Sequence, residues 1–227
     1  MRRSRLIIAA VVVLFLIGCQ APKIRLFPSA ADPLQEYTLA GAEKGKVLVI
    51  SIRGTISDTP QKQFVTTRPS MVQEVVSQLR KAEEDPEVRA VILKVNSSGG
   101  SVTATDILYN EIVTFKQKTK AKVVVAMMGV AASGGYYISL PADYILAHPT
   151  SVTVSVGVLF LRTDLAGLKD KIGVGVELSK TGENKDMGSP FRQATIEEKP
   201  IIEDKIDQLG KRFLDRIAEH RKIDPET

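Results

Sequence analysis

The apolar residues of this chain recur with two periods, which predict where it forms strands and where it forms helices. Segments rich in Val and Ile predict strands at residues 46–52, 89–95, 123–127, 143–147, 152–159 and 175–179. Apolar residues at helical spacing predict helices over about 70–85, 101–115, 164–172 and 195–220. The first and last of these begin with the capping-box spacings Ser70-x-x-Gln73 and Thr195-x-x-Glu198. Because strands alternate with helices, the sequence predicts an α/β domain with parallel pairing.

The first residues have the pattern of a targeting segment. Three arginines precede an apolar run at 6–17, which is shorter than the roughly 20 residues needed to span a bilayer and typical of a signal-peptide core. The run ends in Leu16-Ile17-Gly18-Cys19, which resembles a bacterial lipobox. We therefore expect a signal peptide at 1–18 and a lipid on Cys19.

A lipid on Cys19 would place the protein on a membrane of the bacterial cell envelope, facing the periplasm or the cell exterior. Residues 19–45 contain three prolines and little periodicity, which predicts a tether, and the remaining residues, 46–227, form the predicted folded domain. The alternative is an uncleaved anchor with a buried thiol. Cys19 is the only cysteine of the chain, which excludes an intramolecular disulfide.

Charge and composition argue against one class of partner, nucleic acid. The chain has 227 residues, enough for one sizeable core, and a formal net charge of +5. Arg2, Arg3 and Arg5 supply three of these charges, which leaves 5 − 3 = +2 for the rest. With so small a charge and no tryptophan, nucleic acid is not an expected partner.

Residues 131–135 (AASGG) follow a predicted buried strand and lead into a predicted short helix at 137–140. The small residues allow a sharp turn that would expose the Ser133 hydroxyl beside the N–H groups of the helix start. This arrangement suits an acyl-transfer nucleophile, as in the G-x-S-x-G elbow, although Ala131 stands at the first glycine position. The alternative is a cluster of small residues that only permits tight packing of a helix on a strand.

A second glycine-rich turn, Gly99-Gly100, also follows a predicted buried strand. Backbone N–H groups from two such turns can converge on a developing oxyanion. The alternative, a phosphate-binding loop, is disfavoured because the chain has no G-x-G-x-x-G and no Gly-Lys-Ser/Thr after either turn. The two histidines of the chain, His148 and His220, are candidate bases for Ser133, but their positions predict structural or solvated side chains. A lysine can act as the general base if burial lowers its pKa towards neutrality, because only the neutral amine accepts a proton.

Four motifs together resemble the signal peptide peptidase A (protease IV-like) family of serine peptidases. They are Asn96-Ser97-Ser98-Gly99-Gly100, Ala131–Ile138, Thr153–Val158 and Gly182-Glu183-Asn184-Lys185-Asp186, and the resemblance covers roughly residues 46–222. It implies a crotonase/Clp protease-like fold, a repeated β-β-α superhelix with a mostly parallel sheet.

The resemblance also implies the site residues. By motif position the nucleophile would be Ser133 and the general base Lys185. Ser155 would hydrogen-bond the lysine amine, and the N–H groups of Gly100 and Gly134 would bind the oxyanion. Because serine and lysine can come from neighbouring domains in this family, we expect Ser133 and Lys185 to lie beyond hydrogen-bond reach within one chain.

The implied function is a membrane-tethered serine endopeptidase that degrades residual signal peptides and other hydrophobic peptides, as a homo-oligomer with active sites between subunits. No cofactor is expected, and no cluster of metal ligands is evident. Three departures from the family pattern are Ser98 for proline, Val154 for glycine, and an end at Thr227 before the family's closing segment. Two explanations of that end stay open, namely a truncated sequence and a protein that lacks the elements completing the domain edge. The alternatives are a catalytically inactive oligomeric envelope scaffold and an acyl-CoA hydratase or isomerase, the latter disfavoured because a secreted protein rarely meets CoA.

Overall fold

The computed structural model describes residues 34–41, 44–62 and 67–223. The predicted signal peptide, Cys19 and most of the predicted tether lie outside these residues. The chain divides into two compact units, and the smaller, at 1–33 and 62–68, contributes only Lys62, Thr67 and Arg68 to the described residues. Two short strands, β2 (Gln61–Lys62) and β3 (Thr67–Arg68), pair with each other. The fold below is that of the larger unit, 34–61 and 69–227.

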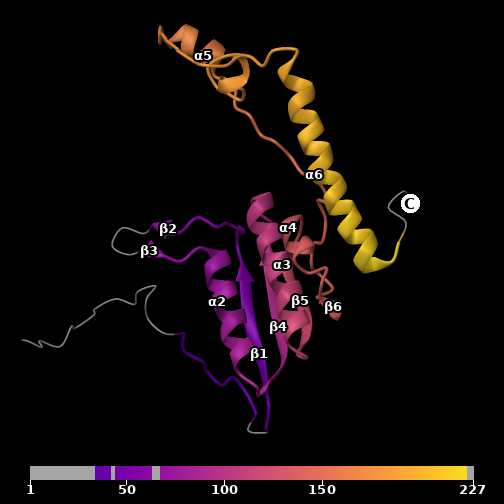
Figure 1. Cartoon of the computed structure of the whole chain (residues 1–227). Helices are drawn as coiled ribbons and strands as arrows, with labels where there is room; N and C mark the ends of the chain where they lie inside the picture. The colour runs from indigo at the N-terminus through magenta and orange to yellow at the C-terminus, as the bar shows by residue number, and fades with distance from the viewer. Residues whose placement is uncertain (1–33, 42–43, 63–66, 224–227) are drawn as a thin grey trace, which may run out of the picture. The chain divides into compact units, whose positions relative to one another are not determined.

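The centre of this unit is a four-stranded parallel sheet (Figure 1). Its strands, in spatial order, are β1 (Lys46–Arg53), β4 (Val88–Ser97), β5 (Lys122–Ala131) and β6 (Tyr144–Ala147). Alternate side chains of the first three strands are fully buried, as the period-2 pattern predicts. The predicted α/β class with parallel pairing is therefore confirmed.

Two helices cover the buried face of the sheet: α2 (Met71–Glu84) and α3 (Val102–Lys118) (Figure 1). The predicted capping box of α2 is present, with the Gln73 N–H donating to Ser70 Oγ at 3.2 Å and the Ser70 N–H donating to Gln73 Oε1 at 2.9 Å. Helix α3 begins after Ser101, whose hydroxyl accepts from the Ala104 N–H. Each helix thus starts where its sequence satisfies the free N–H groups of the first turn.

Four further helices complete the unit. Helix α4 (Gly134–Tyr137) follows β5 directly, α5 (Ala166–Lys171) and the 3₁₀ helix η1 (Glu183–Asp186) lie in the long connection after β6, and α6 (Glu198–Arg221) is the last. The predicted reciprocal bonds between Thr195 and Glu198 form at the start of α6. None of the helices within residues 34–41, 44–62 and 67–223 is long and apolar enough to cross a bilayer.

Two predicted strands are wrong. Residues 152–159 and 175–179 alternate as strands do, but the structure forms no strand in either segment. Val152 makes a single bridge to Val130 and the Val154 carbonyl accepts from the Ser133 N–H, but no strand among the described residues pairs with residues 155–159. Alternation predicts a strand only where a partner satisfies the backbone N–H and C=O groups.

The side chains of the connection from β6 to α6 are largely exposed. Between Pro141 and Glu198 no residue is buried, and large apolar side chains such as Leu159, Leu161 and Ile196 are more than four-fifths exposed. Monomeric soluble proteins rarely leave so many large apolar residues uncovered.

Candidate active site

Ser133 occupies a sharp turn between β5 and α4. Its backbone has φ 49° and ψ −120°, and only three non-glycine residues of the described chain, Ser133, Ser155 and Lys222, have positive φ. The Tyr136 and Tyr137 N–H groups donate to the Ser133 carbonyl at 3.0 Å, which fixes the turn from the helix side. A serine held in this sparsely populated conformation is typical of a nucleophile elbow, in which the turn presents the hydroxyl.

The glycine-rich turn after β4 packs directly against Ser133. A Cβ built on Gly99, where φ is +100°, would lie 2.7 Å from the Gly134 nitrogen and 3.2 Å from Ser133 Oγ. A Cβ on Gly134 would lie 2.6 Å from Thr105 Oγ1, and one on Gly100 only 1.8 Å from the Ile56 carbonyl oxygen. The two glycine-rich turns therefore approach each other as closely as they do because these residues carry no side chain.

Gly100 and Gly134 each present a free N–H. Neither N–H donates to any acceptor among the described residues, whereas the N–H groups of the neighbours Gly99, Ser101 and Gly135 are all engaged. Gly134 is buried, and since more than nine in ten buried backbone N–H groups in proteins are paired, its free N–H is a notable feature of this turn, whereas Gly100 is exposed. Such a pair can bind a developing oxyanion.

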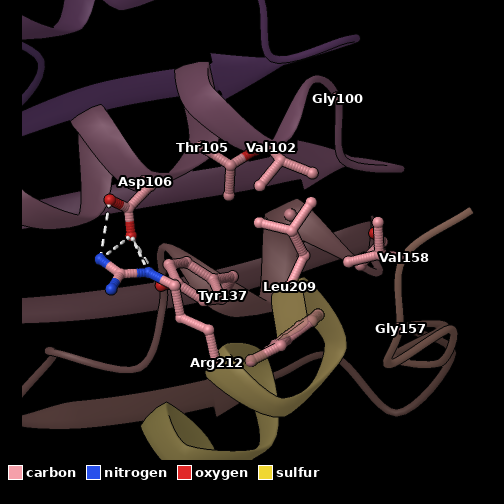
Figure 2. Close-up of a pocket in the computed structure, with 12 residues that line it drawn as sticks. Gly100, Val102, Thr105, Asp106, Tyr137, Gly157, Val158, Leu209 and Arg212 are labelled. Atoms are coloured by element: carbon pink, nitrogen blue, oxygen red, sulfur yellow. Dashed lines mark hydrogen bonds and ion pairs between the residues drawn. The ribbon is translucent and has the colours of Figure 1, made fainter. Parts of the chain in front are cut away.

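Ser133, Gly100 and Gly134 line one pocket. Figure 2 shows this pocket with Gly100, Val102 and Leu209 labelled. Its walls come from α3, from the loop after β6 and from α6. Apolar side chains make up much of the lining, namely Val102, Val158, Leu209 and Phe213. The structure thus brings the predicted nucleophile and both predicted oxyanion donors to an apolar pocket that suits an apolar ligand.

An ion pair between Arg212 and Asp106 joins α6 to α3, and Tyr137 of α4 donates to the same carboxylate (Figure 2). The Tyr137 hydroxyl donates to Asp106 Oδ1 at 2.8 Å, and Arg212 Nη2 donates to both oxygens of the same carboxylate at 2.9 Å. Burial alone would raise the pKa of Asp106, but the bonds from Tyr137 and Arg212 hold it below its usual value. Burial, reinforced by the Asp106 carboxylate, raises the pKa of Tyr137 to about 12. Tyr137 is therefore a fixed neutral donor and no base for Ser133.

The backbone of Ser155 lies close in space to the backbone of Ser133. The Ser133 N–H donates to the Val154 carbonyl at 3.1 Å, so the residue after Val154 follows immediately alongside the turn. Ser155 itself is exposed and has φ 67°. Its predicted partner, Lys185, does not bond to it among the described residues.

Lys185 is not part of the Ser133 pocket. It lies on η1, its side chain is exposed, and within the described chain its amine makes no hydrogen bond or ion pair. The predicted pairing of Ser133 with Lys185, within one chain or between chains, stays a prediction.

A cluster of charged side chains holds the loop that carries Lys185. Arg192 Nε donates to Asp186 Oδ2 at 2.6 Å, and its Nη1 and Nη2 donate to both oxygens of Glu198, whose side chain is 1% exposed. Lys180 Nζ donates to Asp186 Oδ1 at 2.7 Å. The Arg192 guanidinium, and then the Lys180 ammonium, hold the pKa of Asp186 well below its usual range. The neighbour of Lys185 is thus fixed to the start of α6.

Neither histidine lines the pocket. Tyr109 and His220 share a hydrogen bond of 2.7 Å between the hydroxyl and Nε2, and burial lowers the pKa of His220. His148 Nδ1 lies 2.9 Å from Thr150 Oγ1 on the surface. Both are structural or solvated, as predicted. In the part of the chain that the structure describes, no group of His, Cys, Asp or Glu is placed to hold a metal ion.

Sequence reasoning missed the residues that α3 and α6 contribute to the pocket. Thr105 and Asp106 come from α3, and Leu209, Arg212 and Phe213 come from α6. The helical spacing of Phe213 and Ile217 indicates a buried face on α6, but nothing local says that this face packs beside Ser133.

Comparisons with known proteins agree with this geometry. Residues 115–227 match the family model described as peptidase family S49, and residues 64–153 match the model described as Clp protease. The chain is 32% identical, over 88% of its length, to an Enterococcus faecium protein named as a signal peptide peptidase SppA, and 36% identical, over 80%, to Protease 4 of Salmonella typhi. It is 29% identical, over 79%, to a chloroplastic serine protease SPPA of Arabidopsis thaliana.

The chain spans only part of these relatives, 58%, 28% and 26% of their respective lengths. The matched segments nevertheless contain both glycine-rich turns and Lys185, and the Clp protease match agrees with the parallel sheet and its covering helices. The fold is Clp protease-like, and the chain belongs to peptidase family S49.

Proposed function

We propose that this protein is a membrane-tethered serine endopeptidase that degrades residual signal peptides and other hydrophobic peptides with a Ser133–Lys185 dyad. One observation carries the proposal: Ser133 lies in a strained turn, in an apolar pocket, beside the free N–H groups of Gly100 and Gly134. The apolar lining supports hydrophobic peptides as the substrate class.

In this mechanism neutral Lys185 takes the proton of the Ser133 hydroxyl as the oxygen attacks a peptide carbonyl carbon. The carbonyl oxygen gains the negative charge, which the N–H groups of Gly100 and Gly134 stabilise. The protonated lysine then gives its proton to the leaving amine, and an acyl-enzyme remains on Ser133. Water, deprotonated by the same lysine, hydrolyses this ester and releases the peptide acid. Ser155 orients the lysine amine.

We propose further that Lys185 reaches Ser133 from a neighbouring copy of the chain. The support is that Lys185 lies outside the Ser133 pocket of its own chain, within a connection that has no buried residue and many exposed apolar ones. A symmetric assembly would cover this surface and bring one chain's lysine to the next chain's serine.

The nucleophile is tested with an apolar fluorogenic peptide and a fluorophosphonate probe. We expect Ser133→Ala to abolish both peptide cleavage and labelling, while its circular dichroism stays that of the wild type. Ser77→Ala, at an exposed serine of α2, is the matched control and should be labelled and active. Turnover retained by Ser133→Ala would exclude Ser133 as the nucleophile.

The base and its origin are tested with Lys185→Met, against Lys171→Met on α5 as the exposed-lysine control. Lys185→Met should lose peptide hydrolysis and Lys171→Met should keep it. When inactive Ser133→Ala and Lys185→Met chains are unfolded together and reassembled at equal amounts, about a quarter of wild-type activity should return, because one junction in about four joins an intact serine to an intact lysine. No recovery would place both residues of the dyad in one chain.

The membrane tether is a separate part of the proposal. Mass spectrometry of the membrane fraction should find residues 1–18 absent and a lipid on Cys19. The Cys19→Ala variant should lose that lipid, and recovery of the intact wild-type chain in the soluble fraction would contradict the tether.

A second candidate function is a non-catalytic oligomeric scaffold of the envelope. It is favoured by the lack of any hydrogen bond between Lys185 and Ser133 in the described chain. Fluorophosphonate labelling of Ser133 in the assembled wild-type protein would exclude the scaffold, and an assembled protein that is neither labelled nor active would support it.

A further inference from the structure

The segment that carries the proposed base is anchored by Arg192. The arginine donates through Nε to Asp186 Oδ2 at 2.6 Å, and through Nη1 and Nη2 to both oxygens of Glu198. The Asp186 side chain is 8% exposed and that of Glu198 is 1% exposed. The guanidinium therefore joins η1, which holds Lys185, to the first residue of α6 through two carboxylates that are almost wholly withdrawn from solvent.

Asp186 follows Lys185 directly in the chain, and both oxygens of its carboxylate are engaged. Arg192 donates to Oδ2, and the Lys180 ammonium donates to Oδ1 at 2.7 Å. Lys185 itself is exposed, and its amine makes no hydrogen bond or ion pair within the described chain. The segment thus places a carboxylate next to its proposed base and binds that carboxylate to other cations.

The charges of this cluster balance beside Lys185. The cations Arg192 and Lys180 face the anions Asp186 and Glu198, so the four formal charges cancel. A lysine acts as a general base only as the neutral amine, and a nearby carboxylate whose charge is not balanced would favour the ammonium form. The other charged residues of these segments are Glu183 of η1, whose carbonyl accepts from Lys180, Arg162, whose Nη2 donates to the Arg192 carbonyl, and Glu197 at the N-cap of α6.

We infer that Arg192 is a positioning residue of the proposed dyad: its guanidinium fixes η1 to α6 and engages the Asp186 carboxylate, so that Lys185 meets Ser133 with a free amine. The inference rests on the proposed peptidase function and adds to it the group that prepares the base. It holds whether the serine belongs to the same chain or to a neighbouring copy, because Lys185, Asp186 and Arg192 lie on one connection of one chain.

The test measures kcat/KM for an apolar fluorogenic peptide as a function of pH in the assembled full-length protein. The acid limb of this profile reports protonation of the general base in the free enzyme. Arg192→Gln removes a positive charge beside Asp186 and should move the midpoint of the acid limb up by about half to one pH unit. Asp186→Asn removes the negative charge instead and should move the midpoint down by a similar amount. Loss of structure alone would not give shifts of opposite sign.

Arg192→Lys separates position from charge. Lysine keeps the positive charge but cannot bridge two carboxylates with a planar fork, so kcat/KM should fall about tenfold while the acid limb keeps its midpoint. Arg89→Gln removes the same charge from an exposed position of β4 and should keep the wild-type profile. If Arg192→Gln does not assemble because Glu198 loses its partner, Lys180→Gln removes the cation from the other Asp186 oxygen and should give the same upward shift.

The outcomes separate this inference from the proposed function. Opposite shifts of the acid limb in Arg192→Gln and Asp186→Asn, together with the reduced kcat/KM of Arg192→Lys, would support the positioning role. Midpoints that stay at the wild-type value or move in the same direction would overturn it and leave the dyad in place, and so would an Arg192→Lys variant as active as wild type. Hydrolysis retained by Lys185→Met would overturn the dyad itself, and the inference with it.

Discussion

Replacing Ser133 by glycine should stabilise the fold more than replacing it by alanine. Ser133 has φ 49° and ψ −120°, a conformation that costs a residue with a Cβ about 1–3 kcal/mol. Glycine removes this cost but loses about 0.5–1 kcal/mol more backbone entropy on folding. The difference leaves Ser133→Gly more stable than Ser133→Ala by about 1 kcal/mol, or about 2–4 °C in Tm for a chain of this length. Neither variant has a nucleophile, so the comparison isolates backbone strain from chemistry.

Equilibrium urea unfolding at a fixed protein concentration measures the difference. Ser77 is the matched control, because it is exposed in the middle of α2 and takes helical dihedrals. There glycine should be less stable than alanine by about 1 kcal/mol, the opposite sign. If Ser133→Gly is also less stable than Ser133→Ala, the turn stores no strain and the elbow interpretation of the site fails.

Two further predictions follow from contacts of the site. Gly100→Ala should unfold at a lower urea concentration than wild type and should lose peptide hydrolysis. The reason is that the alanine Cβ would lie 1.8 Å from the Ile56 carbonyl oxygen. A variant that stays fully active and stable would contradict the close packing of this turn. Asp106→Asn should be less stable than wild type by roughly 1 kcal/mol at pH 7, a modest figure because solvent screens the partly exposed ion pair with Arg212. Since the pKa of Asp106 is lowered in the folded state, its contribution is present above the unfolded pKa and is lost as the pH falls through the folded one. Urea unfolding should therefore show the stabilities of the two proteins converging as the pH is lowered, and a gap that stays the same as the pH falls would exclude this carboxylate as the cause.

The strands and helices of the core were predictable because local pattern and tertiary environment agree there. Residues 46–52, 89–95 and 123–127 are rich in β-branched side chains and have neighbours to pair with, so periodicity sufficed. Residues 152–159 and 175–179 have the same alternation, but beyond the contacts of Val152 and Val154 with the end of β5 they pair with no strand of the described chain. Whether a β-prone segment becomes a strand depends on the partner edge, which its own sequence does not encode.

The sequence predicted the site residues that lie in the two glycine-rich turns. It did not predict the residues that α6 contributes to the pocket. Ser133, Gly100 and Gly134 each follow a strand of one parallel sheet, and adjacent strand ends meet at one edge. Leu209 and Phe213 reach the same pocket from α6, far along the chain, through contacts that no local motif announces.

The close packing of the two glycine-rich turns limits how this protein can change. A Cβ at Gly99 would strike the Gly134 nitrogen, one at Gly134 would strike Thr105, and one at Gly135 would lie 2.6 Å from the Ser97 carbonyl oxygen. A mutational library that varies one of these positions at a time should recover only glycine, since every larger residue meets a neighbour that cannot yield alone. Descendants with a redesigned site would have to exchange both loops in a single step, so this region should be inherited as a block.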